Sequence, residues 1–203
     1  MHVRFTLLAG DPAQLGNAIR YYEDEGRPQI EGEAGSLGLS LFENAELGVA
    51  GMETWWVSGD EMRGTEKTED ALRAKAAKMA VATTSVERFD IGIYLRSARP
   101  HPGGGLRLTR LDTDPARVDA AVSAYQDTAV PWLTETDGFC ETMLYVDRRT
   151  GRAISETVWR DANALAASRS ASAAIRVEIV AVTDSVVRAV EEYRVVSTTV
   201  RRG

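Results

Sequence analysis

The chain has 203 residues, of which 44% are hydrophobic, and a net charge of −6 at neutral pH. This length and composition allow a full hydrophobic core in one or two domains. The acidic balance argues against a nucleic-acid partner, and no run of Lys or Arg is present that would bind an anionic membrane. We expect a cytoplasmic protein, because the sequence has no membrane-length apolar stretch, no signal-peptide pattern, and a single cysteine, Cys140.

The sequence matches itself after a shift of 103 positions. An ungapped comparison of 3–58 with 106–161 gives 17 identities in 56 pairs, including Arg4 with Arg107 and Trp56 with Trp159. A period of this length is far above those of solenoids, so each copy is expected to be a small domain. We therefore predict a first repeat over 1–97, a linker rich in Pro and Gly over 98–105, and a second repeat over 106–203.

Each copy is predicted to begin with a strand and a helix. Val3, Phe5 and Leu7 alternate with polar residues, which is typical of a half-buried strand, and Leu106 and Leu108 do the same in the second copy. Asp11-Pro12 and Asp114-Pro115 are typical helix starts. The helices that follow carry apolar residues at helical spacing, at Leu15, Ala18, Ile19 and Tyr22 and at Val118, Ala121, Val122 and Tyr125. We expect them to end near Pro28 and Pro131.

A hairpin, a second helix and a last strand complete each copy. The hairpins are expected over 37–57 and 139–159, with turns through Gly48 and Gly151. The second helix is predicted over 69–81, and its counterpart is marked by Ile175, Ile179 and Val182. The last strands contain Phe89 to Leu95 and Tyr193 to Val195. The fold class is therefore α+β, with two ferredoxin-like βαββαβ repeats whose bare sheet faces close on each other as an intramolecular dimeric α+β barrel.

Several of these residues resemble a known family. The run Leu106-Arg107-Leu108-Thr109, the turn Asp147 to Arg152, Thr157-Val158-Trp159 and Glu191-Glu192-Tyr193 are similar to antibiotic biosynthesis monooxygenase-like domains of the dimeric α+β barrel superfamily. The resemblance covers nearly all of the second copy and, more weakly, the first. It implies that two such domains pair their sheets into one barrel. It also implies a range of roles, which includes cofactor-free monooxygenases of aromatic polyketides and haem-degrading enzymes.

Haem degradation is not expected, because the residues that the haem-degrading members use are missing from this sequence. The haem-degrading members use a His on the helix after the hairpin Trp and an Asn on the first strand. This sequence has Thr65 and Ser168 at the first of these places, and the first strands contain no Asn. The two histidines, His2 and His101, fall at the terminus and in the linker, so they supply neither a catalytic triad nor a zinc site. We expect no metal and no cofactor.

The candidate ligand-binding residues are matched between the copies: Arg4, Glu53 and Trp56 in the first, and Arg107, Glu156 and Trp159 in the second. Each Trp can wall an aromatic ligand, although simple burial is the favoured explanation. An Arg–Glu pair is predicted in each copy on the sheet face turned away from the helices, where it can set register or orient an acidic ligand. Tyr22 and Tyr125 are interpreted as core residues with hydrogen-bonded hydroxyl groups.

Two functions remain open at this point. One is a small-molecule-binding barrel that acts as a cofactor-independent monooxygenase on an aromatic substrate, by stabilising a substrate anion while oxygen reacts with it. The other is a non-catalytic binding or assembly module with a packed interior. Gly38, Ser40 and Gly51 are smaller than their counterparts Glu141, Met143 and Ile154, so the larger cavity is expected in the first copy. The fused pair can be a monomer, or it can dimerise through its outer helices.

Overall fold

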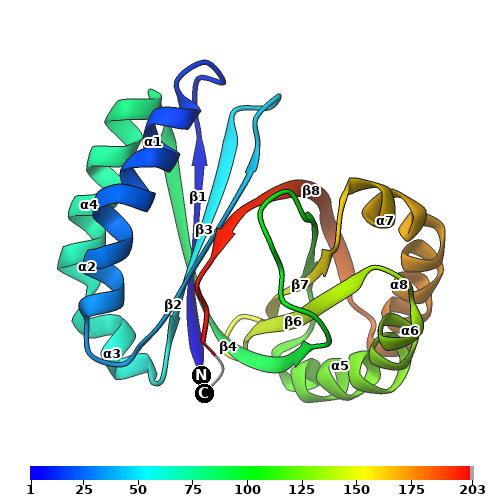
Figure 1. Cartoon of the computed structure of the whole chain (residues 1–203). Helices are drawn as coiled ribbons and strands as arrows, with labels where there is room; N and C mark the ends of the chain where they lie inside the picture. The colour runs from blue at the N-terminus through cyan, green and yellow to red at the C-terminus, as the bar shows by residue number, and fades with distance from the viewer. Residues whose placement is uncertain (202–203) are drawn as a thin grey trace. The chain divides into compact units, whose positions relative to one another are not determined.

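The computed structural model describes residues 1–201, and within them eight strands follow one another in the order β1-β3-β2-β8-β5-β7-β6-β4 around a closed antiparallel barrel. The described chain divides into two compact units, which we call unit 1 (residues 1–88 and 195–201) and unit 2 (residues 89–194). Each unit carries a sheet with helices on one face, as Figure 1 shows. The α+β barrel expected from the sequence is confirmed.

Unit 1 has its own central strands and a helical layer. Its elements are β1 (His2–Ala9), α1 (Leu15–Tyr21), η1 (Tyr22–Gly26), α2 (Arg27–Gly32), β2 (Ser36–Asn44), β3 (Val49–Trp56), α3 (Gly59–Gly64), α4 (Glu66–Ala80) and the first part of β4 (Thr83–Arg96). Strand β3 pairs with both β1 and β2. The chain end returns to β2, where the Thr199 N–H donates to the Leu39 carbonyl at 2.9 Å.

Unit 2 repeats this order of elements. They are β5 (Gly105–Asp112), η2 (Pro115–Arg117), α5 (Val118–Ala124), η3 (Tyr125–Ala129), α6 (Val130–Glu135), β6 (Phe139–Asp147), β7 (Arg152–Trp159), α7 (Ala162–Ala167), α8 (Arg169–Thr183) and most of β8 (Val186–Thr198). Strand β7 pairs with β5 and β6, β8 pairs with β5 through Val186–Arg194, and β4 pairs with β6 through Asp90–Arg96.

The boundaries of the compact units lie inside the long strands β4 and β8. Unit 1 ends at Arg88 and resumes at Val195, whereas the repeat boundaries predicted from the sequence lie in the segment 98–105. Strand β4 therefore begins in unit 1 and ends paired to β6 in unit 2. The last part of β8 belongs to unit 1 in the same way. Each sequence copy thus contributes the end of its last strand to the other compact unit.

The first helix of each copy is longer than the prolines suggested. The chain turns through a π-helix at Tyr22–Gly26 and continues as α2 to Gly32, with Pro28 in the first turn of α2. Pro131 occupies the same place in α6, after the π-helix Tyr125–Ala129. The prediction that these prolines end the helices is wrong. A proline is tolerated in the first turn of a helix, and the wider π-turn resets the hydrogen-bond register before the ring.

The second helices, α4 and α8, are each 15 residues long and begin 103 positions apart. Both end on a non-glycine residue in the left-handed region, Val81 at φ 49° and Asp184 at φ 55°. Val182, which the sequence placed on the packed face of α8, is exposed, whereas Thr183 is buried and its hydroxyl donates to the Ile179 carbonyl at 2.7 Å. Ile175 and Ile179 pack against the core as predicted, so the prediction for this face is wrong only at Val182.

Each unit has its own core between helices and sheet. In unit 1 the core includes Trp56, Tyr22 and Leu72, and in unit 2 it includes Trp159, Tyr125 and Phe139. The hairpin turns are set by Gly48 and Gly151, whose φ angles of 67° and 77° lie in the region that favours glycine. Within residues 1–201, no helix combines the length and the apolar character needed to span a bilayer.

Candidate functional site

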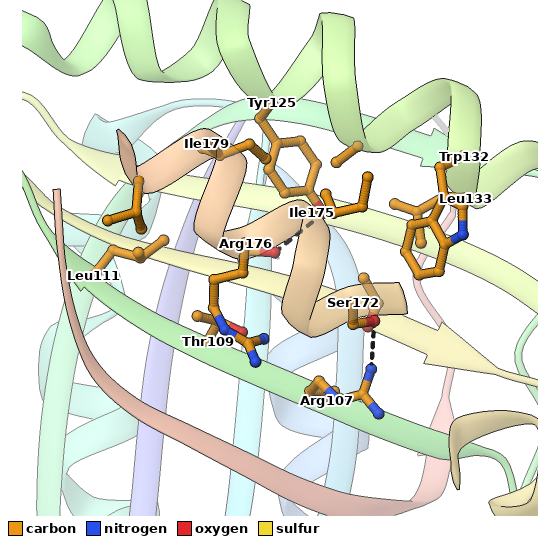
Figure 2. Close-up of a pocket in the computed structure, with 14 residues that line it drawn as sticks. Arg107, Thr109, Leu111, Tyr125, Trp132, Leu133, Ser172, Ile175, Arg176 and Ile179 are labelled. Atoms are coloured by element: carbon orange, nitrogen blue, oxygen red, sulfur yellow. Dashed lines mark hydrogen bonds between the residues drawn. The ribbon is translucent and has the colours of Figure 1, made fainter. Parts of the chain in front are cut away.

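A partly open pocket lies in unit 2 between helix α8 and strands β5 and β7, with η3 and α6 along its side (Figure 2). Its volume is about 60 Å³. Apolar side chains make most of its wall: Leu111, Tyr125, Ala129, Trp132, Leu133, Ile175, Ile179 and Val180. Six polar residues complete it: Arg107, Thr109, Ser155, Thr157, Ser172 and Arg176. An apolar wall with a few polar groups is typical of small-molecule sites.

Two small side chains leave room for this pocket. Ser155 on β7 and Ser172 on α8 line the pocket. At the positions 103 residues earlier, unit 1 has Met52, which packs in its core, and Glu69, which is buried. A Met or Glu side chain at these positions in unit 2 would project into the cavity. The pocket is therefore a local difference between two otherwise similar units.

Arg107 on β5 is buried and fully bonded. Its guanidinium donates to the Ser168 hydroxyl at 2.9 Å, to the Ser172 hydroxyl at 2.7 Å and to the Leu165 carbonyl at 2.9 Å. It also forms an ion pair with Glu192 on β8, with Nη2 and Oε1 2.9 Å apart. Charge-assisted bonds of this kind fix a side chain firmly. Arg107 therefore provides a rigid positive floor beneath Ser172.

Arg176 on α8 is half-buried and points from the helix toward Thr109, on the same side of the pocket as Arg107 (Figure 2). Within residues 1–201 its guanidinium makes no hydrogen bond or ion pair. Burial, and then the positive charge of Arg107, lower the pKa of the Arg176 guanidinium. A cation in this position gains free energy from any anion that enters the pocket.

The hydroxyl group of Tyr125 is held in place by two neighbours. It lies 2.7 Å from the Thr142 hydroxyl, and the Ser155 hydroxyl donates to it at 3.1 Å. Burial raises the pKa of the Tyr125 phenol. The group is therefore neutral at physiological pH and orders the pocket wall, in agreement with the sequence interpretation of a packed, hydrogen-bonded tyrosine.

Trp159 stands behind the pocket wall. Its indole N–H donates to the Thr157 hydroxyl at 3.1 Å, and its ring contacts that of Trp132 with centroids 6.1 Å apart. Thr157 and Trp132 both line the pocket. In unit 1 the Trp56 indole donates in the same way to Thr54, at 3.0 Å. Both tryptophans pack on the helix side of their sheets.

The predicted Arg–Glu pairs are wrong. The Cα partner of Arg4 across the sheet is Thr54, and that of Glu53 is Phe5, so Arg4 and Glu53 point to opposite faces. Arg4 turns toward the helices, where it pairs with Glu66 at 3.1 Å and with Glu69. Thr54, opposite Arg4 on the third strand, carries no charge, and the carboxylates that pair with Arg4 come from α4.

The second copy repeats this correction. The Cα partner of Arg107 is Thr157, and that of Glu156 is Leu108, so Glu156 lies on the face away from the pocket. There the Tyr145 hydroxyl donates to the Glu156 carboxylate at 3.4 Å. Of the six candidate residues, Arg107 alone lines the described pocket, and Trp159 adjoins it. Whether Arg4, Glu53, Trp56 and Glu156 bind a ligand stays a prediction.

The sequence placed the larger cavity in the first copy because of Gly38, Ser40 and Gly51. None of these residues lines the pocket described above. Unit 1 does have an open hollow of about 370 Å³ on its outer helix surface, bordered by Tyr21 and Met79 among others. It is an open surface feature, so it offers no enclosed wall to a ligand.

The residue that sequence reasoning missed is Arg176. Its signal was its place on the inner face of α8, next to Ile175 and Ile179, where a charge is unexpected. The shift of 103 also aligns it with Arg73, whose neighbour one turn earlier is Glu69. Comparing that pair with Ser172 and Arg176 would have shown that the second copy lacks a carboxylate.

The chain has the fold of the antibiotic biosynthesis monooxygenase-like, dimeric α+β barrel type. An anthrone oxidase-like protein shares it with a TM-score of 0.70 and 17% identity, over 98% of this chain and 92% of that one. A ferredoxin fold protein of Listeria monocytogenes, related to antibiotic biosynthesis monooxygenases, does so with a TM-score of 0.54 and 11% identity, over 97% and 96% of the chains.

The chain is also similar in sequence to the uncharacterized protein Rv2557 of Mycobacterium tuberculosis. The two are 26% identical over 176 residues, which cover 87% of this chain and 79% of the relative. No family model matches the chain. The expected resemblance to the dimeric α+β barrel proteins is thus confirmed at the level of the fold.

Proposed function

We propose that this protein binds a small aromatic molecule in the pocket of unit 2 and oxidises it with dioxygen, without a bound cofactor. The observation that carries the proposal is the pocket itself, in which Arg107 and Arg176 face a largely apolar cavity. The fold shared with an anthrone oxidase-like protein supports an oxidative role.

The apolar walls suit a flat ring. Tyr125, Trp132 and Ile175 border the cavity from three different elements, and aromatic side chains favour stacked or edge contacts with another ring. The volume of about 60 Å³ is well below the roughly 300–1,000 Å³ of drug-sized pockets. The ligand is therefore a single ring, or a larger molecule of which one ring enters.

The chemistry requires a substrate anion. A phenol that loses its hydroxyl proton becomes electron-rich, and a nearby guanidinium stabilises the resulting phenolate. The phenolate can then react directly with dioxygen at a ring carbon that carries hydrogen. The O–H and C–H bonds of the substrate break, one oxygen atom becomes the second carbonyl of a quinone, and the other leaves as water. Arg107 and Arg176 stabilise the anion, and Tyr125 and Trp132 hold the ring.

Oxygen uptake tests the proposal. The purified protein, dialysed against a chelator, would be incubated with a panel of single-ring phenols and naphthols while dissolved oxygen and quinone absorbance are recorded. We expect oxygen consumption and quinone formation in equal amounts, and a decrease of both in the Arg176→Gln variant. Uptake equal to that of protein-free solutions for every member of the panel would refute the oxidative function.

The packed interior of unit 1 favours a structural role for this half of the chain. Its counterpart of the pocket is filled by Met52 and Glu69, as a packed structural module would require. We therefore propose one working site per chain, with the first copy acting as scaffold. This proposal includes three predictions from the sequence: the duplication of the domain, the cytoplasmic location, and the monomeric or dimeric state.

A further inference from the structure

Both units carry the same pair of arginines between sheet and helix. In unit 1 these are Arg4 on β1 and Arg73 on α4, and in unit 2 they are Arg107 and Arg176, each 103 positions later. In each unit the strand arginine donates to a hydroxyl at the start of the long helix, Thr65 at 3.2 Å or Ser168 at 2.9 Å. The shared geometry makes the two sites directly comparable.

In unit 1 a carboxylate of the protein occupies the space between the arginines. Glu69 is buried and forms an ion pair with Arg4, and its Oε2 lies 3.9 Å from Nη1 of Arg73. The Thr54 hydroxyl donates to its Oε1 at 2.9 Å. Arg73 has further ion pairs with Glu66 at 3.7 Å and with Asp70. The positive charge of this site is therefore neutralised from within.

In unit 2 that carboxylate is missing. Ser172 stands at the position of Glu69, and Ala173 stands at that of Asp70. Glu192, the acidic partner of Arg107, is shared with Arg169, whose Nη2 lies 2.6 Å from Oε2. Arg176 receives no carboxylate within residues 1–201. Arg107 and Arg169 thus share one carboxylate, Arg176 has none, and the cavity lies where unit 1 has Glu69.

We infer that the ligand of unit 2 is an anion, and that its charged oxygen takes the place that the Glu69 carboxylate has in unit 1. Combined with the apolar walls and the small volume, this identifies the ligand class as single-ring aromatic carboxylates and phenolates. The inference rests on the proposed ligand pocket, but not on any reaction taking place there. It also implies one binding site per chain, because unit 1 supplies its own anion.

Calorimetry with benzoate and benzamide tests the charge of the ligand, since the two probes have nearly the same shape and differ in charge. We expect benzoate to bind with one site per chain and benzamide to bind at least about ten-fold more weakly, as is typical when a hydrogen bond to a charged group is lost. Arg176→Gln should lower benzoate affinity to that of benzamide. Arg149→Gln, which removes the same charge from an exposed turn of unit 2, should leave it unchanged.

A second variant reconstructs the arrangement of unit 1. Ser172→Glu places a carboxylate beside Arg107 and Arg176, so benzoate binding should be lost while the circular dichroism spectrum and cooperative unfolding are kept. Equal affinity for benzoate and benzamide, unchanged benzoate binding in Ser172→Glu, or two benzoate sites per chain would each overturn the inference. In the first case the pocket survives, and oxygen uptake decides the proposed function separately. Absence of binding of both probes to the wild-type protein would overturn the pocket as well.

Discussion

Filling the pocket with the side chain that unit 1 uses should stabilise the protein and abolish binding. The variant is Ser155→Met, which copies Met52. Burying a Met side chain contributes roughly 1.5–3 kcal/mol, and methionine adapts readily to irregular space. The lost hydrogen bond from Ser155 to Tyr125 costs about 0.5–1.5 kcal/mol, since Tyr125 keeps its contact with Thr142. The net gain is about 1 kcal/mol.

The assay is thermal and urea unfolding, with Ser155→Ala as the matched control. For a chain of this size, 1 kcal/mol corresponds to a rise in Tm of roughly 2–4 °C. Ser155→Ala loses the hydrogen bond without filling the space, so it should be slightly less stable than the wild type and keep benzoate binding. If Ser155→Met is destabilised by more than about 1 kcal/mol, or still binds benzoate, the cavity does not have the place and size described above.

Three further predictions concern the surroundings of the pocket. Arg107→Met should destabilise the fold by roughly 1.5–3 kcal/mol in urea unfolding, because it removes the charged hydrogen bonds to Glu192, Ser172 and the Leu165 carbonyl; a loss below 1 kcal/mol would contradict this. Trp159→Phe should cost about 1 kcal/mol, through the lost bond to Thr157, in the same measurement. Hydrogen bonds from Arg169 and Arg107 lower the pKa of Glu192 in the folded protein. The carboxylate therefore stabilises the fold above its unfolded pKa near 4.5, and this stabilisation is lost as the pH falls through the lower folded pKa. This part of the pH dependence of stability should be absent in Glu192→Gln.

The sequence was sufficient for the fold because the repeat supplied two independent readings of each element. The apolar spacing of Leu15, Ala18 and Ile19 and the alternation around Phe5 describe burial that the structure confirms. Pro28 and Pro131 misled the prediction because a π-turn precedes each of them, and a π-turn has no apolar periodicity of its own. The exchange of the ends of β4 and β8 between the compact units depends on contacts distant in sequence, which local patterns do not encode.

The candidate site was harder to predict for a related reason. Arg4 and Arg107 were correctly singled out as a matched pair, but their partners were chosen on the third strand, where one residue of register decides the face. The observed partners lie elsewhere: Arg4 pairs with Glu69 on α4, whereas Arg107 bonds to Ser168, at the start of α8, and to Glu192 on β8. Helix residues meet strand residues according to packing rotation, which the sequence specifies less sharply than strand alternation.

Truncating Glu69 should convert the closed site of unit 1 into one that accepts an anion. Glu69→Ser removes a buried partner of Arg4, which typically costs roughly 3–5 kcal/mol. The missing atoms are close to those of acetate, so added acetate should bind in the gap and restore stability. At about 100 times its Kd, such a ligand returns about 2.7 kcal/mol.

Chloride at the same ionic strength separates this rescue from general salt effects, and Glu69→Gln is the matched control because its side chain still fills the gap. We expect acetate to raise the Tm of Glu69→Ser clearly more than chloride does, and to have the same effect as chloride on Glu69→Gln. Equal effects of acetate and chloride on Glu69→Ser would mean that the space between Arg4 and Arg73 does not select a carboxylate. The analogy that assigns an anionic ligand to Arg176 would then lose its basis, since it depends on Glu69 being bound for its charge and shape.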